Sequence, residues 1–375
     1  MYSAPLAAVR HRVAVGQPLP FDVYGNGERD LLLARGRLLN SLGQLESLLA
    51  RGTTAILDES LEPVEVARHV SRLDLPQVWK QARDRLSASL GARHSEDFAC
   101  RLGVSAEQVA ALVRRDQDLA IFEVLSEPRP GEDAESLGPG VLYSTQCAVM
   151  ALLIARGLRW SESEIELAAK VALTMNLSIL DRPELTQGPE WVAHPVRSRE
   201  LLEQAGVTDR NWLRAVELHH EREDGSGFPA GSTEVPRVAA LVRCASAFVA
   251  GISAQAAGEG ATTDHVVRAV YQAERGNLFA ATLVREAGLY PPGCAVTLAT
   301  GETAVVVKRG RSIQAPLVAV MMNRFDRFFD SPIPRDTSER GLGVVRALPR
   351  GRFRPSREQL HMALQGFAPA ALQAG

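Results

Sequence analysis

Leu218-His219-His220-Glu221-Arg222-Glu223-Asp224-Gly225-Ser226-Gly227-Phe228-Pro229 is the stretch around which this chain is organised. Two adjacent histidines and three carboxylates fall within its first seven positions. The apolar residues at 212, 213 and 216 indicate the last turns of a buried helix, so the histidines arrive where that helix ends. A sharp turn is predicted next, because Gly225 and Gly227 can adopt a positive φ and Pro229 cannot continue a helix.

The two histidines have a functional and a structural interpretation. Adjacent residues of a helix diverge by about 100°, so His219 and His220 can serve one small site only if the helix ends there. The structural alternative is that a histidine pair at a helix C-terminus satisfies carbonyl groups and complements the helix dipole. The chain has no His-Glu-x-x-His motif, which excludes the common zinc-protease pattern.

Together with the turn, this stretch resembles the signature His-His-Glu-x-x-Asp-Gly-x-Gly-Tyr-Pro of the HD-GYP family, bacterial hydrolases of cyclic di-GMP. Phe228 stands in the place of the tyrosine. The resemblance extends from about Leu142 to about Gly288. It implies an all-helical bundle that holds two or three metal ions. It also implies a loop that contacts diguanylate cyclase (GGDEF) domains, here formed by Glu221, Asp224, Gly225, Ser226, Gly227, Phe228 and Pro229.

The resemblance also locates the family's metal ligands in this chain. Three histidine positions are kept, as His194, His219 and His220. Four other positions are substituted: the first histidine by Tyr143, the His-Asp pair by Met175 and Asn176, and the late aspartate by Ser246. The Gly-Lys that follows the His-Asp pair becomes Ser178-Ile179, and small residues at 254–263 replace an Arg-Pro-Tyr-Arg stretch that faces the nucleotide.

These substitutions remove charge from the expected site. Two divalent ions about 4 Å apart repel by about 17 kcal/mol at an effective dielectric of about 20, and bridging carboxylates normally offset that repulsion. Asn176 carries no charge, and the thioether of Met175 is a soft donor unsuited to iron, manganese or magnesium. We therefore expect no working two-metal centre, no catalytic residue and no cofactor.

Two interpretations of the remaining histidines stay open. Three histidines and a water are a known zinc geometry, so one ion, or with a reduced ligand set two ions of iron, manganese or zinc, is the alternative. The favoured interpretation is that His194, His219 and His220 are neutral and hydrogen-bonded in a core where Met175 and Tyr143 replace the metal.

The turn itself has two interpretations as well. Asp224 can cap the local backbone while the glycines make the bend, which requires no partner. This explanation leaves Phe228 unaccounted for. An exposed aromatic residue on a rigid loop is typical of a protein-contact anchor, so we expect Phe228 to serve as one.

Composition excludes several classes of protein. The chain has 375 residues, of which 46% are hydrophobic and 23% charged, and its net charge of −2 provides no basic surface for nucleic acid. A small anionic nucleotide remains open as a ligand. Its four cysteines are far apart and are expected to be reduced. We identify no signal segment and no apolar run near the roughly 20 residues that span a bilayer, so we expect a cytoplasmic protein without a membrane anchor.

The pattern of residues predicts a mainly α protein in four parts. Residues 1–60 form a small α+β module, in which Ser41 and Gln44 cap a helix that is followed by a strand at 53–57. Residues 61–130 form a helical connector, and 131–288 form the HD-type helical bundle, with a linker near 127–140 and a capping box at Ser161 and Glu164. Residues 289–375 form a β-rich appendix that opens with a hairpin at 296–307.

The function expected from these features is a degenerate HD-GYP signalling protein. It would act through contacts with GGDEF-domain or other signalling proteins, or by binding cyclic di-GMP. The alternative is a metal-dependent cyclic di-GMP phosphodiesterase with a reduced ligand set. A third interpretation is a homodimeric scaffold that pairs through amphipathic helices at 75–125.

Overall fold

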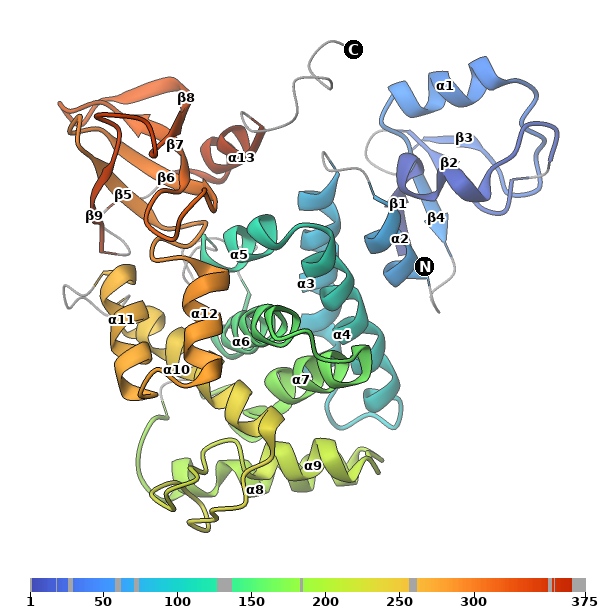
Figure 1. Cartoon of the computed structure of the whole chain (residues 1–375). Coiled ribbons are helices and arrows are strands. Elements are labelled where there is room, and N and C mark those ends of the chain that lie inside the picture. Colours follow the sequence, from blue (N-terminus) through green and yellow to red (C-terminus); the bar gives the residue numbers. More distant parts are fainter. Residues whose placement is uncertain are drawn as a thin grey trace.

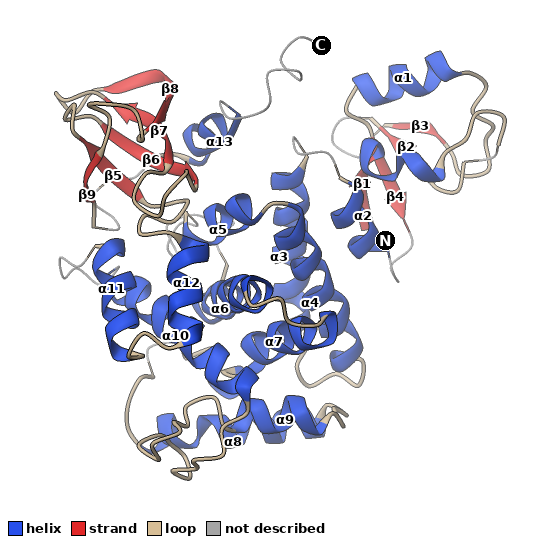
Figure 2. Cartoon of the chain, in the orientation of Figure 1, coloured by secondary structure: helices blue, strands red, loops and turns tan. Residues whose placement is uncertain are grey.

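Helices fill the centre of the molecule, and a small antiparallel sheet lies near each end of the chain (Figure 1, Figure 2). The computed structural model describes residues 2–17, 19–25, 30–57, 62–70, 74–126, 137–182, 185–255, 262–349, 353 and 355–365. The predicted fold class is confirmed: mainly α, with a small α+β module before the helices and a small β-rich part after them.

The N-terminal module combines four short strands with one α-helix. Its elements are β1 (Tyr2–Pro5), the 3-10 helix η1 (Leu6–Arg12), β2 (Asp22–Tyr24), β3 (Leu31–Leu33), α1 (Leu42–Ala50) and β4 (Thr54–Leu57). The strand order is β1-β4-β2-β3, and every pair is antiparallel. The predicted cap of α1 is confirmed, since Ser41 Oγ accepts from the Gln44 N–H and Gln44 Oε1 accepts from the Asn40 N–H.

Four helices follow: α2 (Glu62–His69), α3 (Leu75–Gly91), α4 (Phe98–Arg115) and α5 (Gln117–Leu125). The apolar positions that predict amphipathic helices are all buried within the chain, namely Val78, Ala82, Leu86, Leu90, Leu102, Val109, Leu112 and Val113. The apolar faces of α3 and α4 therefore pack inside this molecule. The expected linker lies mostly outside the described residues, which stop at 126 and resume at 137.

The central bundle consists of α6 (Pro139–Gly157), α7 (Glu162–Thr174), the 3-10 helix η2 (Leu177–Ile179), α8 (Pro189–Gln204), α9 (Arg210–Glu217), α10 (Arg237–Gln255), α11 (Thr263–Ala273) and α12 (Leu278–Ala287). The capping box of α7 is confirmed, with Ser161 and Glu164 bonding reciprocally. Helix α7 ends at Thr174, and Asn176 has φ −107° and ψ 21°, in keeping with the low helix propensity of asparagine.

Helix α6 is the most apolar element of the bundle. By length and composition alone this helix would suit a membrane span, so the expectation that no run approaches that length is wrong. Inside the protein, most of the helix is buried. A helix that packs against neighbours on all sides is apolar all round, which explains the composition of α6.

The C-terminal part is a five-stranded antiparallel sheet of order β8-β7-β6-β5-β9. Its elements are β5 (Ala295–Leu298), β6 (Thr303–Lys308), β7 (Leu317–Met322), β8 (Phe328–Asp336), β9 (Val344–Ala347) and the helix α13 (Arg357–Gln365). The predicted hairpin is confirmed as β5 and β6. A small core joins Phe122 of α5 to the sheet and to Ala363 of α13.

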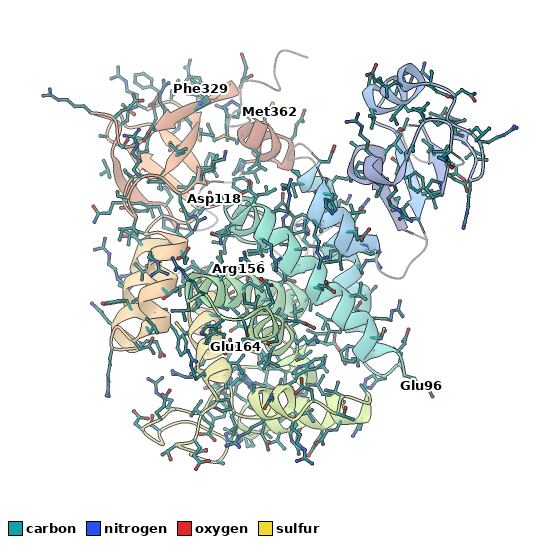
Figure 3. All side chains as sticks on the ribbon, turned by 45° about the vertical axis from the view of Figure 1, so that its right-hand side comes forward. Glu96, Asp118, Arg156, Glu164, Phe329 and Met362 are labelled. Carbon is teal, nitrogen blue, oxygen red and sulfur yellow. The ribbon has the colours of Figure 1, made fainter. Side chains whose placement is uncertain are left out.

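An ion pair fixes the C-terminal sheet to the helices. Arg309, just after β6, donates to Asp118 of α5 at 2.5 Å, and Asp118 lies where α5 faces the sheet (Figure 3). The same guanidinium donates to the backbone oxygen of Glu286 at 2.7 Å and to Gln117 at 2.9 Å. Arg309 therefore joins the C-terminal sheet to α5 and to the end of α12.

Candidate metal centre

The three retained histidines lie close together where α8 meets the end of α9. His194 lies on α8, and His219 and His220 follow Leu218, the residue that caps the C-terminus of α9. One ring nitrogen of each histidine lies within 4.8 Å of the others. The structure thus brings His194 to the corner formed by the histidine pair.

The hydrogen bonds of two of these rings define which nitrogen carries the proton. His194 Nδ1 lies 2.5 Å from the backbone oxygen of Trp191, and His219 Nδ1 lies 2.7 Å from that of Val216. A carbonyl oxygen can only accept, so both Nδ1 atoms must be the donors. In the neutral rings both Nε2 atoms are then unprotonated, and they face each other at 3.3 Å.

Burial keeps all three rings neutral. His194 and His219 are almost fully buried. Loss of solvation lowers the pKa of His194 to about 4, and the same effect together with the neighbouring His194 lowers the pKa of His219 to about 3. Burial, and then the other two histidines and Arg243, also lower the pKa of His220 well below its ordinary value. The cluster is therefore uncharged at neutral pH.

Two aromatic side chains cover the cluster. Phe228 stacks on His220 with ring centroids 4.4 Å apart and planes at 19°. Trp191 lies 4.5 Å from His194 and 5.0 Å from His220 by the same measure. Phe228 is half-buried and faces inward, so it is not the exposed anchor that the sequence favoured. Trp191 was missed in the sequence, although its position one helical turn before His194 could have indicated it.

Glu221 secures the turn that follows the histidines. Its side chain is fully buried, and its two carboxylate oxygens accept from the backbone N–H of Ala230 at 2.7 Å and of Ser232 at 3.0 Å. Within the predicted loop, Glu221 therefore acts as an internal clamp that joins the two ends of the turn.

The rest of the loop follows the structural interpretation made from the sequence. Asp224 accepts from the Ser226 N–H at 3.1 Å and from the Ser226 hydroxyl at 2.5 Å, which caps the bend. These bonds lower the pKa of Asp224. Gly225 has φ +74°. A Cβ at Gly227 would lie 2.4 Å from Cα of Glu221, so this position accepts only glycine.

Two of the substituted ligand positions bind each other. The hydroxyl of Tyr143, on α6, lies 2.9 Å from the hydroxyl of Ser246, on α10, and also donates to the Ser246 backbone oxygen at 3.2 Å. Burial, and then the nearby Cys147, raise the pKa of Tyr143, so this phenol stays protonated. Where the resemblance implies two metal ligands, this chain has a neutral hydrogen-bonded pair.

The other two substituted positions are also without charge. Met175 is completely buried at the end of α7. Asn176 is partly buried, and no hydrogen-bond partner within the described residues reaches its side-chain oxygen. Ser178, in place of the family's glycine, bonds to Ser198 and to the backbone oxygen of His194, which ties η2 to α8.

A buried ion-pair network lies behind the loop and was not predicted. Arg243 of α10 donates to Glu274 at 2.6 Å, and both side chains are almost fully buried. Arg222, two residues after His220, lies 3.6 Å from the same carboxylate, and Asn277 donates to its other oxygen at 3.0 Å. The loop is thereby connected to α10 and to the turn between α11 and α12.

These donors fit one metal ion and not two. Among the described residues, no carboxylate or thiol joins the three histidines. A single ion with three imidazole ligands and an exchangeable fourth position needs no carboxylate, whereas a pair of ions requires a bridging anion. His194, His219 and His220 would hold that ion, and it would supply Lewis acidity or a structural cross-link.

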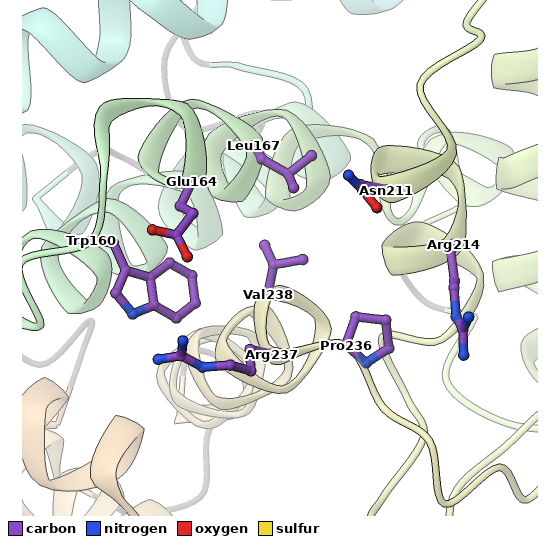
Figure 4. A pocket seen from close by; sticks show the side chains of 8 residues that line it. All are labelled: Trp160, Glu164, Leu167, Asn211, Arg214, Pro236, Arg237 and Val238. Carbon is purple, nitrogen blue, oxygen red and sulfur yellow. The ribbon is translucent and has the colours of Figure 1, made fainter.

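Two cavities lined by described residues do not include the histidines. One, of about 170 Å³, opens between α7, α9 and the start of α10, where Trp160, Leu167 and Val238 line it and the guanidinium of Arg237 lies over the Trp160 ring (Figure 4). The other is an apolar groove of about 690 Å³ between one face of α8 and the loop, lined by Pro189, Val192, Ala193, Val196, Arg197, Glu200 and Pro229.

Comparison with known proteins gives one structural similarity. A scan against protein-family models finds no match, and neither does a search of curated proteins. Among solved structures the chain is similar to "Bd1817, a HDG"Y"P protein from Bdellovibrio bacteriovorus", with a TM-score of 0.47 and 14% sequence identity. The match covers 75% of this chain and 97% of that one.

Proposed function

We propose that this protein is a degenerate, HD-GYP-type signalling protein of the bacterial cyclic di-GMP system. It does not hydrolyse cyclic di-GMP, and it acts through contacts with another signalling protein, a GGDEF-domain protein being the first choice. The motif at 219–229 and the helical bundle that carries it support the family. The hydrogen bond between Tyr143 and Ser246 is the observation that supports the loss of hydrolysis.

That hydrogen bond matters because it occupies two ligand positions at once. Hydrolysis of a phosphodiester by two metals needs anionic oxygens that bridge the ions and offset their mutual repulsion. Tyr143 and Ser246 direct their hydroxyls at each other, and Met175 and Asn176 supply no charge. Rebuilding a two-metal centre would require both the bond to break and at least one carboxylate to be restored.

The groove beside the loop is the surface that we propose for the partner. Val192 on α8 is 43% exposed, and with Val196 and Pro229 it presents apolar surface next to the turn. Arg197 and Glu200 supply polar groups at its rim, as is usual for protein-contact surfaces. We also propose a cytoplasmic location, which the burial of α6 and the four free cysteines support.

A metal-dependent phosphodiesterase with a reduced ligand set is the second candidate. The convergence of His194, His219 and His220 is the observation that favours it, because three imidazoles can hold one catalytic ion. This candidate predicts turnover that disappears when His219 is replaced.

The test has two arms. In the first, purified protein is incubated with cyclic di-GMP and Mn²⁺, Fe²⁺ or Zn²⁺, and products are separated by chromatography. We expect no turnover above the protein-free blank, and the same result for His219→Asn. Turnover that is lost in His219→Asn would establish the second candidate instead.

The second arm tests the partner surface. Val192→Glu should abolish binding to a purified GGDEF-domain protein in a titration. Val345→Glu is the matched control, because Val345 is a 64% exposed valine on the distant C-terminal sheet. Equal binding by the two variants would contradict the proposed surface.

A further inference from the structure

We infer that the cavity between α7, α9 and the start of α10 binds a free α-amino acid with an apolar side chain, such as leucine. Glu164 and Arg237, at one end of the cavity, take the ammonium and the carboxylate of this ligand, and Leu167 and Val238 contact its side chain (Figure 4). The inference does not depend on the proposed function, because none of these residues belongs to the histidine cluster or to the groove beside the loop.

The cavity has an apolar floor and a polar rim. The floor consists of buried or half-buried side chains, namely Trp160, Leu167, Pro236 and Val238. The rim consists of exposed polar side chains, namely Glu164, Asn211, Arg214 and Arg237. The volume is about 170 Å³, and an engineered apolar cavity of about 150 Å³ binds benzene. The space therefore suits an apolar side chain of the size of leucine or phenylalanine, with the charged groups of the ligand at the rim.

Arg237 is the arginine of the rim that is available to a carboxylate. Its guanidinium lies over the Trp160 ring, 5.1 Å from the ring centroid. A planar guanidinium that lies over an aromatic face keeps the N–H groups of its edge for a planar acceptor such as a carboxylate. Arg214 is already paired with Glu234 at 3.4 Å, whereas no ion pair of Arg237 is found among the described residues.

Glu164 supplies the opposite charge. Its Oε2 accepts from the Ser161 N–H at 2.9 Å and from the Ser161 hydroxyl at 2.7 Å, and these bonds of the capping box hold the carboxylate in place. The same bonds, and then the charge of Arg237, lower the pKa of Glu164, so this side chain is anionic at neutral pH. Among the described residues Oε1 has no hydrogen-bond partner, and it can therefore accept from an ammonium group.

The two charges select the class of ligand. A simple carboxylate or a phosphate gains from Arg237 but is repelled by Glu164, and a simple amine meets the reverse situation. An α-amino acid carries both charges at one end, so it gains from both residues at once. Leu167 and Val238 lie between these charges and the amide of Asn211 across the cavity (Figure 4). The side chain of the ligand extends along this apolar stretch.

Isothermal titration calorimetry on the full-length protein tests the site with probes that differ by one group. L-leucine should bind at one site per chain, with a dissociation constant between about 10 µM and 1 mM, as expected for a ligand of this size. Glycine lacks the apolar side chain, leucinamide lacks the carboxylate, and isocaproate lacks the ammonium group. Each of these three probes should bind about tenfold more weakly than leucine, or worse.

A pair of arginine variants tests the carboxylate contact. Arg237→Met removes the guanidinium but keeps an unbranched side chain over Trp160, and it should weaken leucine binding about tenfold. Arg210→Met is the matched control, because Arg210 is also an exposed arginine at the first residue of a helix and does not line the cavity. It should leave leucine binding unchanged.

Two further variants test the ammonium contact and the cavity itself. Glu164→Gln keeps an acceptor for Ser161 but loses the charge, and it should also weaken leucine binding about tenfold. Leu167→Trp fills the cavity and should abolish binding. Circular dichroism shows whether each variant is folded, and the exposed positions of Glu164 and Arg237 keep the test usable if Leu167→Trp is not.

Absence of binding by both leucine and phenylalanine would overturn the inference. Isocaproate or leucinamide binding as tightly as leucine would also overturn it, because the ligand would then be a simple anion or a simple cation. Unchanged leucine binding in folded Arg237→Met would have the same consequence. None of these results bears on the hydrolysis of cyclic di-GMP, so a failure here is distinguishable from a failure of the proposed function.

Discussion

Glu221→Gln should release the loop that covers the histidines. The carboxylate of Glu221 is completely buried and accepts one backbone N–H with each oxygen, from Ala230 and from Ser232. Glutamine has nearly the same shape, but its amide nitrogen cannot accept. One of the two N–H groups is therefore left without a partner, and the other keeps only a neutral acceptor.

The expected loss of stability follows from these two bonds. A hydrogen bond to a charged group contributes about 1.5–3 kcal/mol, and a neutral acceptor is roughly half as strong as a charged one. Losing one bond and weakening the other should therefore cost about 2–4 kcal/mol locally. Since about 1.4 kcal/mol corresponds to a factor of ten, the amides of Ala230 and Ser232 should exchange about 30-fold to 1,000-fold faster with deuterium.

Hydrogen exchange followed by mass spectrometry is the appropriate assay, because it reports the loop separately from the rest of a multi-part chain. Glu223→Gln is the matched control: it lies in the same loop, its side chain is 65% exposed, and its distance to Arg243 is 3.9 Å. We expect a change within about 0.5 kcal/mol for this control. Unchanged exchange of residues 230 and 232 in Glu221→Gln would refute the clamp, as would equal effects in both variants.

Three further outcomes follow from the same structure. Gly227→Ala should lower the midpoint of thermal unfolding, because the new Cβ would lie 2.4 Å from the backbone of Glu221. Gly343→Ala is the control and should leave the midpoint unchanged, because the space around Gly343 is open; equal midpoints would contradict the close contact at Gly227. Tyr143→Phe should lower the free energy of unfolding in urea by about 1 kcal/mol. Adding Ser246→Ala should lower it little further, since each change removes the same hydrogen bond between the two hydroxyls; additive losses would argue against the pair. In chelator, the free energy of unfolding should fall as pH drops from 6.5 toward 4, because the unfolded chain protonates histidines that stay neutral when buried. His194 contributes about 3 kcal/mol of this loss, so His194→Asn should reduce the pH dependence by that amount in urea titrations at each pH, while the part due to His219 remains.

Local signals were enough to predict several features correctly. The cap of α1 at Ser41 and the capping box at Ser161 and Glu164 involve residues three positions apart, so the sequence contains the whole interaction. The bend at 224–229 likewise depends on one aspartate and on glycines beside it. Such short-range bonds form wherever the residues occur in the right order, whatever the rest of the chain does.

Interactions between distant segments were not predictable in this way. Tyr143 and Ser246 are 103 positions apart, Arg309 and Asp118 are 191 apart, and the pair of Arg243 with Glu274 spans 31. Each depends on which faces of which helices meet. The same limitation explains why Phe228 was expected to be exposed: its own sequence context does not reveal that His220 and Trp191 lie beneath it.

The sequence by itself determined which groups this chain has available, namely three histidines without the carboxylates and a glycine turn, because residue type and spacing set charge and backbone freedom. Only the tertiary structure decided what those groups do together. Packing of α8 against the end of α9 brings His194 and His219 face to face, and carbonyl oxygens of each helix define which ring nitrogen is left unprotonated.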